Sequence, residues 1–583
     1  MPVSAAPDQT VRVIDGGGPQ LGTRMIPGFG LGPIEQNSYS AQSTAINLCA
    51  WSLMPQPTGY RSQTGDEYVH LGFARSAAWL VALLMVCIFG SPKPCLAQDM
   101  ATVIPYPRVP GDRPDPDFPS VRVNGIAVDT VRTDMNVGYT HFAFSGTVTV
   151  EVVVRRPIGA FDLSPHRYGI DAITDGSVLI FRLSQPRKLH LRVDDLPRFF
   201  IFADAPEKDA PELGQPGVRD IRDYGVYDSL DAVQTTAIQR AIDDAARDEG
   251  VLYIPPGSYR AGELSLRSGL SVYLAPGAVL RGSGDVSDYP RGELGTQQIY
   301  LLDCHGVRIT GRGVIDGQGR ALRLSADNST NSRMKLIRSL RAENCAVTGV
   351  ILRDAGTWSV HLVESNDIRF ANYKLLSNAI LDDPGFPWEP NTDGFDPDNS
   401  SRVIIEDGFV SCSDDAIAVK LKFGALRDMT DIAFRRNVVW TVKSALKIGT
   451  EVRDHRVVDV AFEDNDVIHA DRGIAVYCYR GATVESATWV GNHFEHIGGD
   501  IKQMNVEIKI RDEGGKGRIR GLLIRDNTFE RFSPNPSKIA GLDSAHMVRD
   551  IVFEDLVIAR ELRMSLEEAQ ISTNRYVDDV SFR

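Results

Sequence analysis

The sequence predicts an all-β fold, in which a small antiparallel β-sandwich precedes a right-handed single-stranded parallel β-helix. Short runs of alternating apolar and polar residues fill the stretch from Val121 to Ala203, a pattern typical of antiparallel sheets. Farther on, units of strand, polar corner and second strand recur at a near-constant interval, as the coils of a β-helix do. An asparagine falls at the corner of four of these units.

Length and composition set the class of protein. The chain has 583 residues, of which 43% are hydrophobic and 24% charged, with a formal net charge of −13. This length allows more than one domain and a large core. The excess of acidic residues, without a basic run of five or more, argues against a nucleic-acid partner. We therefore expect an acidic protein without a nucleic-acid partner, and we expect it to be a monomer.

The N-terminal part contains a predicted targeting segment. Residues 1–74 are rich in Gly, Pro, Ser and Gln, and we expect a disordered leader or a misplaced start, since translation from Met54 would remove most of them. Residues 75–97 contain Arg75, the apolar run AAWLVALLMVCIFG and an end of small residues, which is the pattern of a signal peptide. The alternative is that this segment is a membrane anchor. Cleavage would give a secreted or periplasmic protein without stable membrane association.

The predicted sandwich spans residues 119–205. A segment rich in Pro and Asp, residues 98–118, is expected to be a linker. The runs VRVNGIAV, HFAFSGTVTVEVVVRR, SVLIFRL and KLHLRVD then alternate apolar and polar residues between turns. Such a domain can bind carbohydrate or cover the open end of the following β-helix, and we favour the covering role.

Residues 206–583 are predicted to form the β-helix. The segment DYGVYDSLDAVQTTAIQRAIDDAA predicts a turn and an amphipathic helix, whose apolar face would cover the first coil and hide its pairing edge. That face consists of Ala237, Ala241, Ile242 and Ala245. Later units begin at Asp431, Asp459, Ala487, Gly521 and Asp550, which are 28, 28, 34 and 29 residues apart. We expect the corner asparagines to be structural, because a left-handed conformation and a side-chain hydrogen-bond ladder are favourable there. They are Asn437, Asn465, Asn492 and Asn527.

Four cysteines follow the predicted signal peptide. Cys304, Cys345, Cys412 and Cys478 are far apart and form no CxxC pair, which argues against a zinc site. Two disulfides and four buried thiols are both compatible with this spacing.

Three aspartates are the candidate catalytic groups. Asp393 precedes the pair Asp414 and Asp415 by 21 and 22 residues, about one coil. Neighbouring coils lie about 4.8 Å apart, so the three carboxylates can share one patch of groove. Repulsion would raise the pKa of at least one of them, which suits a general acid in glycosidic bond cleavage. The alternative is that both motifs only form turns.

These motifs resemble a known enzyme family. NTDGFD from Asn391, followed by SDDAIAVK from Ser413, resembles the active-site region of glycoside hydrolase family 28, the polygalacturonases. The resemblance implies that Asp414 is the general acid and that Asp393 and Asp415 hold the attacking water of an inverting hydrolysis. Two further motifs differ: Ser444 stands in place of the family's histidine, and Lys509-Ile510-Arg511 reverses its Arg-Ile-Lys. The sandwich region resembles the N-terminal domain of glycoside hydrolase family 49.

The repeat register predicts the lining of the groove. SCSDDAIAV, SALKIGT and RGIAVYCY follow their corners at the same position, so they should be neighbouring strands on one face. That places Lys447, Arg472, Tyr477 and Tyr479 near the aspartates. We expect Asn391, Lys447, Lys509, Arg511 and Tyr477 to bind substrate. Trp358 and Trp388 could stack on sugars, although core packing is the commoner role. No histidine is assigned to catalysis.

The sequence thus predicts a hydrolase of polygalacturonate or a related pectic glycan, without a metal or organic cofactor. Basic groove residues suit an acidic glycan, because they pair with carboxylates. One alternative is an α-glucan hydrolase of the dextranase type. Another is a pectate lyase, which would need a calcium cluster and an arginine base. A third is a carbohydrate-binding protein without catalysis.

Overall fold

The structure is a computed structural model that describes residues 101–583, except 134, 293, 326–331, 379–390 and 500. The chain divides into a unit from Met1 to Pro92 and a unit from Lys93 to Arg583, and only the second contains described residues. The predicted leader 1–74 and signal peptide 75–97 therefore lie outside the described residues. No helix in the described ranges is long and apolar enough to cross a membrane.

Two sheets form the sandwich. One has the order β1 (Thr102–Pro105), β5 (Gly138–Ser145), β11 (Phe199–Asp204), β10 (Arg187–Val193) and β7 (Phe161–Ser164), with β4 (Thr130–Arg132) beside β5. The other has the order β3 (Ile126–Val128), β2 (Ser120–Val123), β6 (Val148–Val153), β9 (Val178–Leu183) and β8 (Ala172–Asp175). All pairs are antiparallel except β11 with β5. Alternation in β6 buries Val148, Val150 and Val152 between the sheets.

The stretch predicted as a linker is partly ordered sheet. Thr102–Pro105 forms β1, which pairs antiparallel with Ser145–Phe142 of β5. Its pairing with β5 makes it part of the sandwich, a long-range contact that the Pro- and Asp-rich composition did not signal.

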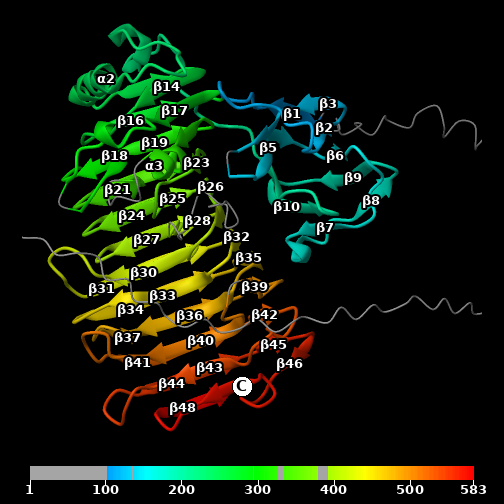
Figure 1. The fold of residues 1–583 in the computed structure, drawn as a ribbon, viewed down its shortest axis with the longest axis vertical. Helices are drawn as coiled ribbons and strands as arrows, with labels where there is room; N and C mark the ends of the chain where they lie inside the picture. The colour runs from blue at the N-terminus through cyan, green and yellow to red at the C-terminus, as the bar shows by residue number, and fades with distance from the viewer. Residues whose placement is uncertain (1–100, 134, 293, 326–331, 379–390, 500) are drawn as a thin grey trace, which may run out of the picture. The chain divides into compact units, whose positions relative to one another are not determined.

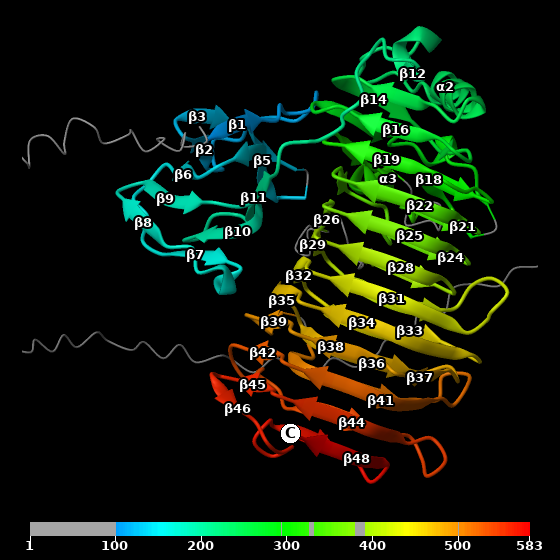
Figure 2. The same ribbon diagram turned by 180° about the vertical axis from the view of Figure 1, so that it is seen from behind.

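The β-helix consists of three stacked sheets of parallel strands (Figures 1 and 2). The 14-stranded sheet contains β12 (Val218–Asp220), β13 (Val251–Ile254), β16 (Ser271–Leu274), β19 (Arg308–Gly311), β22 (Glu343–Thr348), β25 (Asn366–Ala371), β28 (Ser401–Glu406), β31 (Met429–Arg435), β34 (Arg456–Glu463), β37 (Thr483–Glu485), β38 (Thr488–Val490), β41 (Arg518–Arg525), β44 (Val548–Glu554) and β48 (Val577–Phe582). The 12-stranded sheet contains β14 (Gly257–Ala261), β17 (Ala278–Gly282), β20 (Val314–Asp316), β23 (Ile351–Arg353), β26 (Lys374–Ser377), β29 (Phe409–Cys412), β32 (Val438–Thr441), β35 (Asp466–His469), β39 (His493–Phe494), β42 (Thr528–Phe529), β45 (Val557–Ile558) and the antiparallel β46 (Glu561–Leu562).

The 11-stranded sheet is the one that carries the candidate site. It contains β15 (Leu264–Ser265), β18 (Gln297–Leu302), β21 (Lys335–Leu340), β24 (Val360–Val363), β27 (Phe395–Asp398), β30 (Ile417–Leu421), β33 (Ser444–Val452), β36 (Arg472–Cys478), β40 (Met504–Ile510), β43 (Ser537–Ala540) and β47 (Ile571–Thr573). Every coil stacks an apolar residue on those of its neighbours, as Ile417, Leu446, Ile474 and Val506 do inside this sheet. The predicted fold class is confirmed.

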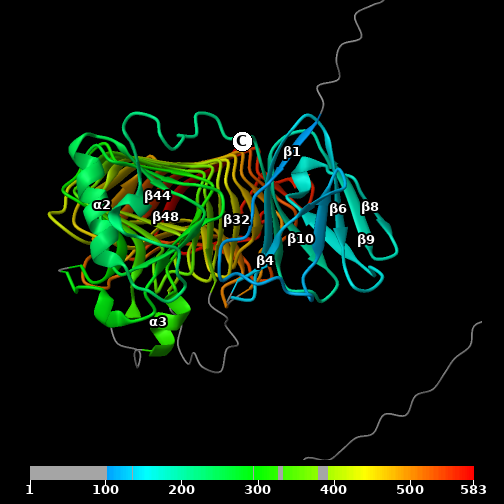
Figure 3. The same cartoon turned by 90° about the horizontal axis from the view of Figure 1, so that it is seen from above.

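Helices are few in the described ranges. The predicted amphipathic helix is α2 (Thr235–Arg247), which lies at the end of the stack that contains β14, the first strand of the 12-stranded sheet (Figures 1 and 3). It buries Ile238, Ala241, Ile242 and Ala245 against the first coils. The others are α3 (Gly319–Ser325) and the 3₁₀ turns η1 (His166–Tyr168), η2 (Ile221–Tyr224) and η3 (Val286–Asp288).

The corner asparagines form the expected ladder. The side-chain oxygen of Asn465 accepts the backbone N–H of Asn437 at 3.0 Å, and that of Asn492 accepts the N–H of Asn465 at 3.0 Å. The amide of Asn465 donates to the carbonyl of Phe434 at 2.8 Å. The left-handed conformation, however, belongs to the residue before each asparagine: Arg436, Asp464, Gly491 and Asp526. The four cysteines are buried free thiols, which decides between the two readings of their spacing.

The sandwich lies beside the β-helix, against the middle of the 12-stranded sheet, and does not cover its end (Figures 1 and 2). Phe200 and Phe202 of β11 pack on Phe409 of β29, with ring centroids 4.6 and 5.1 Å apart. Buried Lys374 of β26 pairs with Asp204. The covering role that we favoured is therefore wrong, because α2 already caps the first coil.

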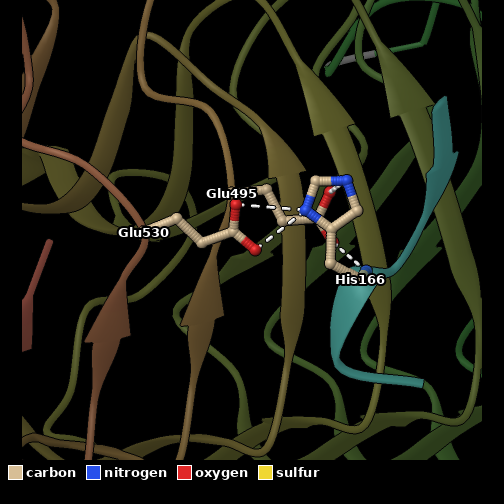
Figure 4. Close-up of side chains that lie close together, drawn as sticks. All are labelled: His166, Glu495 and Glu530. Atoms are coloured by element: carbon tan, nitrogen blue, oxygen red, sulfur yellow. Dashed lines mark hydrogen bonds and ion pairs between the residues drawn. The ribbon is translucent and has the colours of Figure 1, made fainter. Parts of the chain in front are cut away.

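His166 is a polar contact at this junction. Its Nδ1 lies 2.8 Å from Glu530, and its backbone N–H donates to Glu495 at 2.5 Å (Figure 4). Its Nε2 lies 2.8 Å from Asp162 of the sandwich. Three carboxylates from both domains thus surround one imidazole.

Candidate active site

Asp393, Asp414 and Asp415 converge at the 11-stranded sheet. Asp393 lies just before β27, and the pair lies just before β30, which stacks on β27 with Phe395 opposite Ile417. One carboxylate oxygen of each residue lies within 4.8 Å of the others. Their exposed fractions are 3%, 9% and 5%. The parallel stacking of coils thus brings together residues that are 21 and 22 positions apart.

Asp415 is held in its ionised form. The backbone N–H of Ser444 donates to its Oδ1 at 3.0 Å, and the Lys447 ammonium bonds its Oδ2. Burial raises the pKa of this carboxyl, but Lys447 and Arg472 outweigh that effect and lower the pKa to about 2. Arg472 reaches the site through Ser444, whose Oγ accepts its Nε–H at 2.9 Å.

Asp414 retains its proton more readily than its neighbour. Burial and the charge of Asp415 raise the pKa of Asp414, although Asn391 opposes them. The side-chain amide of Asn391 donates to its Oδ2 at 2.9 Å, and the backbone N–H of Asp415 donates to its Oδ1 at 2.9 Å. The two adjacent carboxyls therefore differ in proton affinity, as an acid and a base require.

Asp393 belongs to a second charged cluster that the sequence analysis missed. The Lys420 ammonium lies 3.3 Å from Asp393, 3.1 Å from Asp396 and 3.5 Å from Glu451. Burial, Asp396 and Asp414 raise the pKa of Asp393 well above its ordinary value. Asp396 and Lys420 stand inside the two motifs already recognised, so their spacing could have identified them. Glu451 carries no comparable sequence signal.

The predicted binding residues on later coils lie on the same face. Tyr477 of β36 and Lys509 of β40 are register partners, and the Lys509 ammonium lies 4.1 Å from the Tyr477 ring centroid. Tyr477 is only 6% exposed, and its hydroxyl bonds Glu507. It therefore supports the groove's charged residues, and the structure leaves little of its ring open for a sugar. Arg511 is exposed and lies 5.2 Å from the Tyr479 ring centroid.

Aromatic and basic groups also line the preceding coils. The Lys420 ammonium lies 3.7 Å from the ring centroid of half-buried Trp358, and those of Lys422 and Lys335 lie 5.1 and 5.5 Å from it. The guanidinium of Arg333 donates to the side-chain oxygen of Asn391 at 2.9 Å. Trp388, the other tryptophan considered, lies outside the described residues. Cations thus flank the three aspartates on both sides along the stack.

The three aspartates are close enough to hold a metal ion in principle. Lys447 and Lys420 already supply positive charge at this position, however, since each pairs with one of the carboxylates. Acid–base chemistry is therefore what the charge distribution serves best.

Comparisons with known proteins match the β-helix. Residues 251–507 match the model of glycosyl hydrolases family 28. A probable polygalacturonase of Vitis vinifera is 27% identical over 317 residues, 47% of this chain and 63% of that protein. A polygalacturonase of Ralstonia solanacearum is 26% identical over 306 residues, 42% of this chain and 57% of that protein. The chain thus spans less than two thirds of these relatives.

A solved structure shares both domains. Dex49A from Penicillium minioluteum aligns with a TM-score of 0.55 and 13% identity, over 82% of this chain and 96% of that one. At this identity the likeness concerns the fold. The predicted resemblance of the β-helix to family 28 is confirmed, the resemblance to family 49 is confirmed at the level of the fold, and the matches support a glycoside hydrolase.

Proposed function

Because residues 251–507 carry the family 28 match and hold the three aspartates, we propose that this protein hydrolyses the glycosidic bonds of an acidic polysaccharide, polygalacturonate or a related pectic glycan. The observation that carries the proposal is the convergence of three carboxylates within 4.8 Å, where the Lys447 ammonium bonds Asp415 and, among the described residues, only neutral groups bond Asp414. Burial and the charge of Asp415 raise the pKa of Asp414, whereas Lys447 and Arg472 lower that of Asp415. Hydrolysis needs one protonated and one ionised carboxyl at the scissile bond.

The residues divide the chemistry as follows. Asp414 gives its proton to the leaving oxygen, and the carboxylate of Asp415 takes a proton from the attacking water. Asp393 completes the water site. Since its pKa is raised, the negative charge that activates water rests mainly on Asp415. Asn391 orients Asp414, and Lys447, Lys509 and Arg511 provide cations for the carboxylates of the glycan.

Inversion of the anomeric centre is proposed from the family resemblance. The separation of the aspartates, within 4.8 Å, is shorter than the roughly 6.5–9.5 Å usual for inverting pairs. Proton NMR of the first product formed tests the point directly. The β-anomer from an α-linked substrate supports inversion, and the α-anomer refutes it.

Replacing the general acid tests the function. Asp414→Asn should lower turnover on polygalacturonate by about a hundredfold or more, because the leaving oxygen loses its proton donor. The assay is the release of reducing ends, and exposed Asp431→Asn is the matched control. Unchanged turnover in Asp414→Asn would exclude the assigned role. Products that absorb ultraviolet light, formed only when calcium is present, would point to a lyase instead.

A neutral α-glucan is the second candidate substrate. It is favoured by the two-domain fold shared with Dex49A and by Ser444 in place of the family's histidine. Parallel assays on pectate, dextran, arabinan and rhamnogalacturonan separate the candidates. Because cations surround the aspartates, we expect the acidic glycans to be cleaved faster than the neutral ones. Secretion or export to the periplasm is proposed from residues 75–97.

A further inference from the structure

A crevice of about 340 Å³ lies between the sandwich and the β-helix, away from the three aspartates. Its walls include Arg192 and Arg198 of the sandwich and Trp440, His469, His496 and Arg531 of the β-helix. The volume is in the range of small-molecule sites, roughly 300–1,000 Å³. Nothing in the proposed hydrolysis uses these residues.

The acidic residues of the crevice are already engaged. Glu495 accepts the hydroxyl of Ser164 at 2.6 Å and the backbone N–H of His166. Asp162 pairs with the His166 imidazole (Figure 4 shows this histidine with Glu495 and Glu530). Asp194 accepts the backbone N–H groups of residues 159 and 160. Asp195 pairs with Arg156, and Arg192 pairs with Asp162 at 3.5 Å. Arg198 and Arg531 are therefore the lining arginines that have no ion pair with a carboxylate of the described residues.

Arg198 is the least compensated of these cations. Its guanidinium lies 3.8 Å from the Trp440 ring centroid, and its Nη1 is buried without a hydrogen-bond partner among the described residues. No carboxylate of the described ranges lies within ion-pair distance of it. Burial lowers the pKa of Arg198 to about 10. A buried donor without a partner destabilises the fold, so an anion bound there would relieve a cost already present.

The raised pKa of His166, about 9, keeps this lining histidine cationic near pH 7, but three carboxylates already surround it. Two other histidines add no charge. Burial lowers the pKa of His469 to about 4, and that of His190 to about 3. Both imidazoles are neutral near pH 7, where they can donate or accept hydrogen bonds beside the ring of Trp440. These neutral imidazoles are polar, so they can form hydrogen bonds with the hydroxyl groups of a sugar.

We propose that this crevice is a second binding site, for a small carboxylate-bearing sugar, in which Arg198 and Arg531 pair with the carboxylate and the neutral imidazole of His469 bonds a hydroxyl. The anion site rests on the geometry of the crevice. The choice of a uronic acid rests on the proposed function, which would release such sugars.

Calorimetric titration of the full chain tests the site, with D-galacturonate, D-galactose and inorganic sulfate as probes. Arg198→Gln should weaken galacturonate binding by about tenfold or more, because one charge-assisted pair is lost. It should leave turnover on polygalacturonate unchanged. The matched control is Arg122→Gln, an exposed arginine of β2 outside the crevice. Arg531→Gln serves as the second variant if Arg198→Gln fails to fold.

The outcomes separate the two proposals. Galacturonate binding whose affinity and stoichiometry are the same in both variants as in the wild type overturns the site. Equal affinity for sulfate and galacturonate overturns the sugar assignment and leaves an unspecific anion site. Galacturonate binding that depends on Arg198, in a protein that hydrolyses none of the glycans assayed, supports the crevice and refutes the hydrolase proposal alone. A crystal structure with galacturonate bound in the aspartate groove only would also overturn the inference.

Discussion

Adjacent residues of identical chemistry differ here because their partners differ. Asp414 accepts hydrogen bonds from the neutral donors Asn391 and the backbone, whereas Asp415 bonds the Lys447 ammonium. A cation in contact stabilises the ionised form of Asp415, and the resulting negative charge favours the protonated form of Asp414. The two pKa values are coupled, so a change at Lys447 should act on both carboxyls.

Lys447→Met should shift the acidic limb of the pH profile to higher pH. Without the ammonium the pKa of Asp415 rises from about 2, so the base becomes protonated at pH values where the wild type keeps it ionised. The measurement is kcat/KM on polygalacturonate between pH 3 and 8, with exposed Lys538→Met of β43 as the control. An acidic limb that stays in place would show that Lys447 acts on substrate binding alone.

At the scale of elements, the repeat predicted most of the site. The interval of about one coil predicted that Asp393 lies beside Asp414 and Asp415, and the register predicted that Lys447 and Tyr477 lie on the same sheet face. The register did not include Lys509, which the structure pairs with Tyr477. Residues that are one coil apart in the sequence lie on adjacent strands of the stack. Their proximity could therefore be predicted from their spacing in the sequence. Glu451 could not be found this way, because only its side chain's reach to Lys420 brings it into the site.

Asn465→Ala should destabilise the β-helix more than a typical polar substitution. It removes the acceptor of the Asn437 N–H and the donor to the Phe434 carbonyl, and both remain buried. Each unpaired buried group costs about 1–3 kcal/mol, so the two together cost roughly 2–6 kcal/mol. Urea denaturation followed by circular dichroism measures the loss of unfolding free energy.

The control for this ladder is Gln185→Ala, at an exposed position of the sandwich, which should change the unfolding free energy by less than about 0.5 kcal/mol. An equally small loss in Asn465→Ala would mean that the ladder contributes no more than the backbone pairing of the coils.

At the scale of the whole molecule, the docking of the sandwich was not predictable from local pattern. Alternation identified its strands, but the contacts of Phe200 and Phe202 with Phe409 join residues more than 200 positions apart. The same holds for the linker prediction, since β1 becomes a strand only through its pairing with β5. Periodicity reports which face of a strand is buried, and it does not report what buries it.

The junction at His166 should make stability depend on pH. The hydrogen bond to Asp162, and then the charges of Glu495 and Glu530, raise the pKa of His166 to about 9, against 6.5 in the unfolded chain. A raised folded-state pKa gives stabilisation that is complete below about pH 6.5 and is lost as the pH rises through 9. His166→Gln should therefore lower the melting temperature at pH 6 and have little effect at pH 10.

Solvent reduces the size of this effect, because the His166 side chain is 34% exposed. The exposed His305→Gln is the matched control and should shift neither melting temperature. Thermal unfolding of the three proteins at pH 6 and pH 10 gives the comparison. A loss of equal size at both pH values would mean that packing of the ring, and not its charge among three carboxylates, secures this part of the junction.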